Sequence, residues 1–162
     1  MKLTSQRINA RPGTGSVSPA VAALVGFAVL MVLGITACGG PEREIRKTLS
    51  EGEREVFDRG QRLSTPCWSC HDLYGKQNKV GPYLAGLYGR AAGSAQYPGY
   101  SKAIQESGVI WDEGTLRSFL VDPAGFIPGT TMAASGPRGG SDVRALVFYL
   151  KHVTSNTAAR EN

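Results

Sequence analysis

Hydrophobic positions spaced by three and four residues predict two amphipathic helices in the last third of the chain. Leu116, Phe119 and Leu120 form one apolar stripe, with the spacing of a helix that buries one face. That helix should end near Pro123, because proline disfavours helical geometry in the residue before it. A second stripe follows Ser141, a possible helix cap, and its members lie mostly on one side of a helix: Val143, Leu146, Val147, Leu150 and Val153.

An earlier helix is predicted from its capping residues rather than from a long stripe. Residues 50–53 read Ser-Glu-Gly-Glu, which has the Ser-x-x-Glu form of a capping box. Val56 and Leu63 would share the apolar face of this helix at heptad spacing. We expect Gly60 to weaken the helix and Pro66 to limit it.

The rest of the chain after residue 50 predicts short elements joined by long loops. Residues 101–107 are a plausible short helix that Gly108 stops, and Asp112 has the character of an N-cap for the helix after it. Glycine and proline recur through residues 72–99 and again through 126–140, which disfavours long regular elements there. The sequence therefore predicts an all-α fold, in which short helices and long loops wrap around the middle of the domain.

The N-terminal third has the layout of an export signal. Lys2, Arg7 and Arg11 precede residues 20–37, which contain no charged side chain. This apolar run is close to the ~20 residues that could span a bilayer. Residues 35–38 read Ile-Thr-Ala-Cys and resemble a bacterial lipobox, in which the signal peptidase cuts before a cysteine that becomes lipidated.

Cys38 is therefore predicted to be lipidated, which also explains an unpaired cysteine in an exported protein. The alternative is an uncut membrane helix with an incidental cysteine near its outer end. Both alternatives place everything after Cys38 on the periplasmic face of a bacterial membrane, because the basic residues before the apolar run stay inside. The predicted organisation is a leader or anchor over 1–37, a tether over 38–49, a domain over 50–155 and a C-terminal tail over 156–162.

Much of the excess positive charge of the chain lies in this leader. The whole sequence has 18 Lys and Arg against 13 Asp and Glu. Removing the three basic residues of the leader leaves 15 against 13, a net charge of +2 from Cys38 onward. Nucleic acid is excluded as an expected partner, and strong electrostatic steering of a partner is not implied by net charge alone.

The motif Cys67-Trp-Ser-Cys70-His71 carries the most specific chemistry of the chain. Cys-x-x-Cys-His is the pattern of covalent c-type haem attachment, with one thioether from each cysteine and an imidazole for the iron. A structural zinc site would need four ligands, and outside the motif only Cys38 and His152 are available. A thioredoxin-like pair would need a strand-helix-strand pattern, which the sequence does not show.

Met132 is the candidate for the second axial position of such a haem. It is the only methionine after the leader, and it lies in Ile127-Pro-Gly-Thr-Thr-Met132, where proline and glycine favour an extended strap. A thioether ligand would raise the reduction potential. His152 is the other strong candidate, but its place near the end of the last predicted helix is explained by the helix dipole.

These residues together resemble the class I cytochromes c of the mitochondrial type over Cys67 to about His152. The matching segments follow in order and at similar spacing: Cys67–His71, Val80–Arg90, Tyr100-Ser101, Trp111, Ile127–Met132 and Tyr149-Leu150. The resemblance implies the class I cytochrome c fold around one covalent haem c, with His71 and Met132 as axial ligands of the iron.

The resemblance also implies roles for further residues. The Pro82 carbonyl would accept a hydrogen bond from the His71 ring and so fix its tautomer. A buried haem propionate would be hydrogen-bonded or screened by four residues: Arg90, Tyr100, Trp111 and Thr130. Leu146 and Tyr149 would pack against the first helix near Leu63.

The sequence departs from the resemblance at the pocket and at the docking face. Phe119 stands where family members commonly have a tyrosine, and Ile104 replaces a common asparagine, which makes the pocket drier. Positions that carry docking lysines in mitochondrial members are occupied here by Ala124, Gly125 and Thr131. A membrane tether would offset this lost charge by raising the effective concentration of a partner.

The expected function is that of a membrane-tethered single-electron carrier, not an enzyme, with no small-molecule substrate. Its expected partners are membrane redox complexes: a quinol-oxidising complex, a terminal oxidase, a reductase or a photosynthetic reaction centre. One alternative is a fixed haem c subunit of a larger oxidoreductase complex. Another is an enzyme or sensor that opens an axial site to peroxide or a gas.

Overall fold

The computed structural model describes residues 40–155, in which every regular element is a helix and no strand is present. The all-α prediction is therefore confirmed. The leader, Cys38 and the tail over 156–162 lie outside the described residues. The elements follow in the order α2 (Pro41–Thr48), α3 (Glu51–Leu63), the 3-10 helix η2 (Thr65–Ser69), α4 (Lys102–Glu106), α5 (Glu113–Val121), α6 (Pro123–Phe126) and α7 (Gly140–Ser155).

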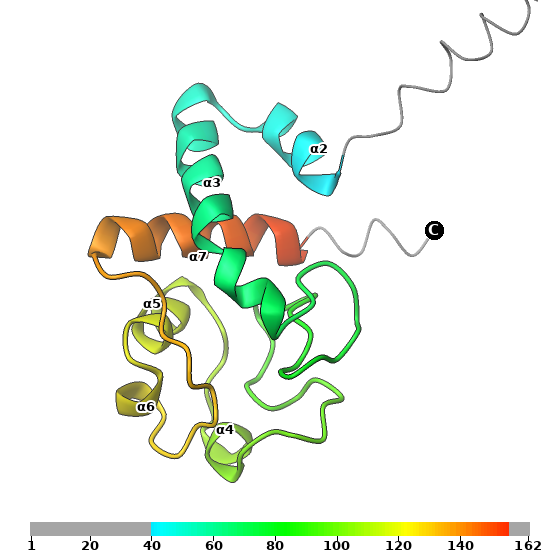
Figure 1. Ribbon diagram of the computed structural model, residues 1–162, viewed down its shortest axis with the longest axis vertical. Helices are drawn as coiled ribbons and strands as arrows, with labels where there is room; N and C mark the ends of the chain where they lie inside the picture. The colour runs from blue at the N-terminus through cyan, green and yellow to red at the C-terminus, as the bar shows by residue number, and fades with distance from the viewer. Residues whose placement is uncertain (1–39, 156–162) are drawn as a thin grey trace, which may run out of the picture. The chain divides into compact units, whose positions relative to one another are not determined.

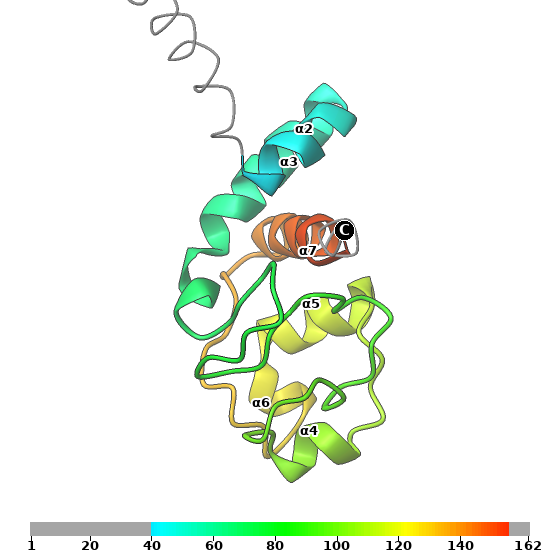
Figure 2. The same ribbon diagram turned by 90° about the vertical axis from the view of Figure 1, so that its right-hand side faces the viewer.

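The frame of the domain is the crossing of α3 with α7, seen in Figure 1. Figure 2 shows α2 and α3 on one side of α7, and α5 on the other side. The predicted stripe of α7 is buried at every one of its five positions. Phe57 of α3 and Tyr149 of α7 are both fully buried, with ring centroids 5.0 Å apart. Burial of these large apolar side chains is the main stabilising term of the crossing.

Gly60 has the opposite role to the one expected from helix propensity. A Cβ atom built at Gly60 would overlap the carbonyl oxygen of Ala145 and would lie 2.6 Å from Tyr149 Cβ. The absence of a side chain therefore allows α3 and α7 to approach closely, and this contact outweighs the cost of a helical glycine. The predicted face of α3 is also partly wrong, because Val56 is 40% exposed and the buried positions are Phe57 and Gly60.

The helix starts and stops were predicted closely. Glu53 accepts hydrogen bonds from the backbone N–H and the hydroxyl of Ser50, at 2.9 and 2.6 Å. Asp112 accepts the Thr115 N–H at 2.7 Å and caps α5. Helix α5 ends at Val121 as expected, but Pro123 then opens the short helix α6, which the sequence pattern did not predict. Helix α7 begins at Gly140, so Ser141 lies inside its first turn.

The tether predicted over 38–49 is wrong for its described part, because residues 41–48 form α2. Ile45 is 4% exposed and Leu49 is 6% exposed, so this segment packs on the domain. The Arg46 guanidinium holds both carboxylate oxygens of Asp58 on α3, at 2.7 Å each. Two apolar residues among many charges were too weak a pattern to reveal this docking.

Two long loop segments complete the fold. Residues 70–101 contain no helix, as predicted, and the segment after α6 runs back to the start of α7 (Figure 1). No helix between residues 40 and 155 combines the length and the apolar character that a membrane span requires.

Candidate haem site

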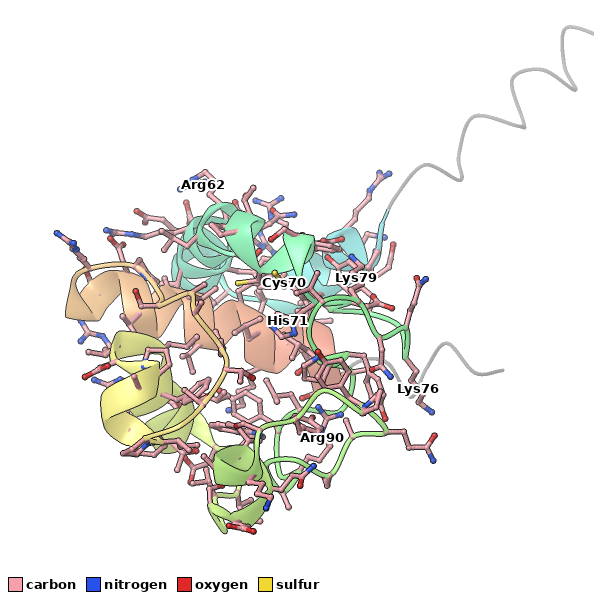
Figure 3. The ribbon with its side chains drawn as sticks, turned by 60° about the horizontal axis from the view of Figure 1, so that its bottom comes forward. Arg62, Cys70, His71, Lys76, Lys79 and Arg90 are labelled. Carbon is pink, nitrogen blue, oxygen red and sulfur yellow. The ribbon has the colours of Figure 1, made fainter. Side chains whose placement is uncertain are left out.

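Cys67 lies in the 3-10 helix η2, which follows the end of α3, and Cys70 comes directly after η2. The Cys67 N–H donates to the Ser64 carbonyl at 2.9 Å, and the His71 N–H donates to the Cys67 carbonyl at 2.9 Å. Both thiols are free and partly buried. Burial raises the pKa of the Cys67 thiol above its ordinary value. The turn therefore presents two free thiols, three residues apart in the sequence, beside a histidine. Figure 3 shows Cys70 next to His71.

His71 is held by the loop that contains Pro82. The carbonyl oxygen of Pro82 lies 2.6 Å from His71 Nδ1. A carbonyl can only accept, so Nδ1 carries the proton and the lone pair of Nε2 is left for a metal ion. Burial lowers the pKa of His71, the Pro82 carbonyl opposes this shift, and the charge of Lys79 lowers it further. A neutral imidazole is the form that binds metals.

Gly81 allows that loop to lie against the ring. A Cβ atom at this position would lie 2.5 Å from His71 Cε1 and 2.9 Å from Nδ1. The Gly81 N–H also donates to the Cys70 carbonyl at 2.8 Å, which joins the loop to the cysteine turn. Sequence reasoning missed Gly81, although its place directly before Pro82 was a usable indication of a close backbone approach.

Arg90 organises the neighbouring loop from within. Its guanidinium donates to the carbonyl of Ala85 at 2.7 Å and to that of Tyr83 at 3.0 Å, and it lies 5.1 Å from the Tyr83 ring centroid. These backbone partners were not predicted from the sequence, which assigned Arg90 only to a propionate. Figure 3 shows Arg90 on the loops away from the cysteine turn. A guanidinium has five N–H donors, so the two contacts leave capacity for an anionic group.

The other three predicted propionate residues come from separate segments. Trp111 is 7% exposed, and its ring lies 5.0 Å from that of Phe119. Tyr100 is half-buried, and burial raises its pKa while the charge of Arg90 opposes the shift. Thr130 accepts the Met132 N–H at 3.3 Å. Their roles toward a propionate stay predictions.

Met132 lies on a turn that its own strap forms. The Thr130 N–H donates to the Ile127 carbonyl at 3.0 Å, and Gly129 has a φ of 91°, which favours glycine. Met132 is partly buried and packs against the hydrophobic core. His152, in contrast, has Nδ1 2.8 Å from the Phe148 carbonyl and its ring 4.3 Å from the Phe148 ring. These local contacts explain His152 without a metal.

The residues present fit a covalent haem. The cysteine turn offers two free thiols, and His71 offers an oriented nitrogen. Apolar side chains that are only partly buried pack against the core from several segments: Leu84, Tyr100, Ala103, Val109, Phe126 and Met132. A large apolar macrocycle could cover such side chains and gain their burial.

Comparison with known proteins decides between the possible uses of the cysteine pair. The family model "Cytochrome c" matches residues 57–154. The chain belongs to the cytochrome c family. This cytochrome c is 45% identical over 85 residues to cytochrome c2 iso-2 of Magnetospirillum fulvum, covering 52% of this chain and 88% of that protein. It is 37% identical over 98 residues to cytochrome c2 of Blastochloris viridis, covering 60% and 77%.

A solved relative supports the same assignment. Cytochrome cH from Methylobacterium extorquens aligns with a TM-score of 0.54 and 36% identity, over 58% of this chain and 95% of that one. The predicted class I cytochrome c fold is therefore confirmed, as are the single covalent haem c and the role as an electron-transfer protein rather than an enzyme. Helix α2 lies outside the residues that the family model matches.

Proposed function

We propose that this cytochrome c is a single-electron carrier tethered to the periplasmic face of a bacterial membrane. Its partners on that membrane are an electron source, such as a quinol-oxidising complex, and an acceptor, such as a terminal oxidase, a reductase or a photosynthetic reaction centre. The observation that carries the tether is the sequence of residues 35–38, Ile-Thr-Ala-Cys, at the end of an uncharged run.

The docking of α2 supports a short connection between lipid and domain. Helix α2 begins at Pro41, so Gly39 and Gly40 alone separate Cys38 from a packed element. Three residue steps span at most roughly 10–11 Å. A lipid on Cys38 would hold the domain close to the membrane surface, where partners in the same membrane have a high effective concentration.

Mass spectrometry of the native N-terminus tests the tether. We expect a chain that begins at Cys38 with lipid attached, and we expect the variant Cys38→Ser to leave the membrane fraction. The periplasmic location is read in the same preparation, from the protease sensitivity of residues 50–155 in intact spheroplasts. An intact Met1 with an unmodified Cys38 would overturn the lipid anchor and favour an uncut helix.

We propose His71 and Met132 as the axial ligands. The bound haem supplies a one-electron couple, and two protein ligands leave no position for a substrate. His71 contributes Nε2 because Pro82 occupies Nδ1. Met132 contributes a thioether from the turned strap, where the Thr130 hydroxyl accepts its backbone N–H.

Replacing Met132 tests this assignment. We expect Met132→Ala to keep the covalent haem, lower the reduction potential and bind carbon monoxide, because a thioether stabilises the ferrous state and closes the position. Thr131→Ala, an exposed neighbour, is the control and should keep the wild-type potential. Wild-type spectra with no carbon monoxide binding in Met132→Ala would show that another residue holds the sixth position.

The alternative is a fixed haem c subunit of a larger oxidoreductase complex. The short connection before α2 favours it, since such a domain has little reach. Extraction in mild detergent followed by native electrophoresis separates the two. A carrier migrates alone, whereas a subunit migrates with its complex in a constant ratio.

A further inference from the structure

Helix α2 brings a carboxylate to the buried side of the frame. The helix is docked through Ile45 and through the Arg46–Asp58 ion pair, and Figure 1 shows it lying over α7. Glu42, in its first turn, is partly buried there. The Tyr149 hydroxyl donates to Glu42 Oε1 at 3.3 Å. Docking of α2 therefore gives a polar partner to the hydroxyl of Tyr149, a residue with 0% exposure.

The hydroxyl of Tyr149 also meets a second tyrosine. Its oxygen lies 3.0 Å from the hydroxyl oxygen of Tyr74. A hydroxyl has one proton, and that of Tyr149 is donated to Glu42, so Tyr74 must donate to Tyr149. Burial, followed by the charge of Glu42, raises the pKa of Tyr149, which keeps this phenol protonated as a donor. Hydrogen bonds in such a chain strengthen one another.

Tyr74 leads from this chain to the cysteine turn. Its ring lies against the ring of Trp68, with centroids 4.9 Å apart and planes at 61°. Trp68 is in the interval between Cys67 and Cys70, and its indole N–H donates to the buried Ser64 hydroxyl at 3.3 Å. The position of Tyr74 thus bears directly on the side chain that fixes the middle of the attachment turn.

We propose that Glu42 is a positioning residue for the attachment turn Cys67–His71 and acts on it through Tyr149 and Tyr74. Glu42 does not touch the iron or its ligands. It holds the Tyr149 hydroxyl, which holds that of Tyr74, which packs Trp68 into place. The N-terminal extension, which the family model does not include, is in this way coupled to the geometry of the redox centre.

The test uses the holo full-length protein and four variants. Glu42→Ala removes the acceptor, and Glu42→Gln keeps an acceptor without the charge. Tyr149→Phe removes the central hydroxyl. Glu44→Ala is the control on the same helix, since Glu44 is exposed and pairs with Lys47 at 2.7 Å. Amide hydrogen exchange at residues 67–71 and circular dichroism of the haem absorption band are measured for each.

In Glu42→Ala and Tyr149→Phe we expect amide exchange at the turn to be roughly two- to tenfold faster, because each variant loses one or two hydrogen bonds. The haem dichroism should change in both. Glu42→Gln should restore most of the wild-type values, Glu44→Ala should retain them, and the double variant of Glu42→Ala with Tyr149→Phe should be no worse than either single one.

Three results would overturn the proposal. One is wild-type exchange and dichroism in Glu42→Ala. Another is an effect of Glu42→Ala that adds to that of Tyr149→Phe, since independent sites add. The third is uniformly faster exchange across residues 50–155 with unchanged haem dichroism, which is the result of a purely stabilising contact. The lipid anchor is not involved in any of these measurements, so its failure would be seen separately.

Discussion

The helical frame and the loop segments are held together by different means. In the frame, α3 and α7 bury large side chains such as Phe57 and Tyr149, and they touch at a glycine. In the loops over residues 70–101, single polar groups hold several backbone positions at once. Asp72 accepts the N–H groups of Tyr74, Gly75 and Gln77, and Arg90 holds two carbonyls. The frame is therefore stabilised mainly by the packing of large side chains, and the loops are stabilised mainly by individual hydrogen bonds.

This contrast follows from what each part must do. The frame needs only to be rigid, and close packing supplies rigidity without specific partners. The loops must bring a carbonyl to His71 and leave room for a large cofactor, so their backbone cannot adopt the regular hydrogen-bond pattern of a helix or a sheet. Buried backbone groups then need side-chain partners, since leaving them unpaired costs free energy.

The largest effect should come from adding one methyl group to the frame. Gly60→Ala places a Cβ against the Ala145 carbonyl, so the two helices must separate. We expect a loss of ~3 kcal/mol in the free energy of unfolding, despite the better helix propensity of alanine. Gly52→Ala in the same helix meets nothing within 4 Å and should be neutral or slightly stabilising. Equal effects of the two substitutions, measured by urea unfolding, would contradict the crossing argument.

A smaller loss of stability should follow from removing a side chain that hydrogen-bonds to several loop carbonyls. Arg90→Met removes the two hydrogen bonds to the carbonyls of Ala85 and Tyr83 but keeps an unbranched apolar stem. Losing charged hydrogen bonds to partly buried carbonyls should cost about 2 kcal/mol. Lys102→Met, at an exposed position, is the matched control and should change the unfolding midpoint little. A change no larger than that of the control would show that other contacts hold this loop.

The same contrast explains how far the sequence could predict the structure. The periodicity around Leu116 and along α7, the caps at Ser50 and Asp112 and the stop at Pro123 are local features, and the structure confirms each. Helix α2 was missed because its docking depends on tertiary contacts of Ile45 and Leu49.

The candidate site was accessible to sequence reasoning only in part. The cysteine turn and His71 are adjacent in the sequence, so the motif itself predicts them. The hydrogen bond between the His71 ring and the Pro82 carbonyl was inferred from the family resemblance, and the structure contains it. The carbonyl partners of Arg90 and the chain from Glu42 to Tyr74 depend on residues far apart in the sequence, and no local pattern predicts them.

The smallest predicted effect lies where the loops meet the frame. The hydroxyl of Tyr88 donates to the Val147 carbonyl on α7 at 3.4 Å. Burial, followed by the charges of Glu113 and Asp112, raises the pKa of Tyr88 from 10.0 to about 12. Between these two values the folded protein holds a proton that the unfolded chain has lost. The stabilising contribution is therefore complete below pH 10.0 and is lost as the pH rises through about 12.

Tyr88→Phe should remove the loss of folding stability at alkaline pH that comes from Tyr88. We expect the variant to unfold at a slightly lower urea concentration than the wild type near pH 8, because it lacks the contact with Val147. The difference should shrink or reverse as the pH rises above 10.0, since only the wild type must then bury a group that favours ionisation. A constant difference from pH 8 to 11 would mean that Tyr88 ionises alike in both states. The join between loops and frame would then be held by packing, as in the frame itself.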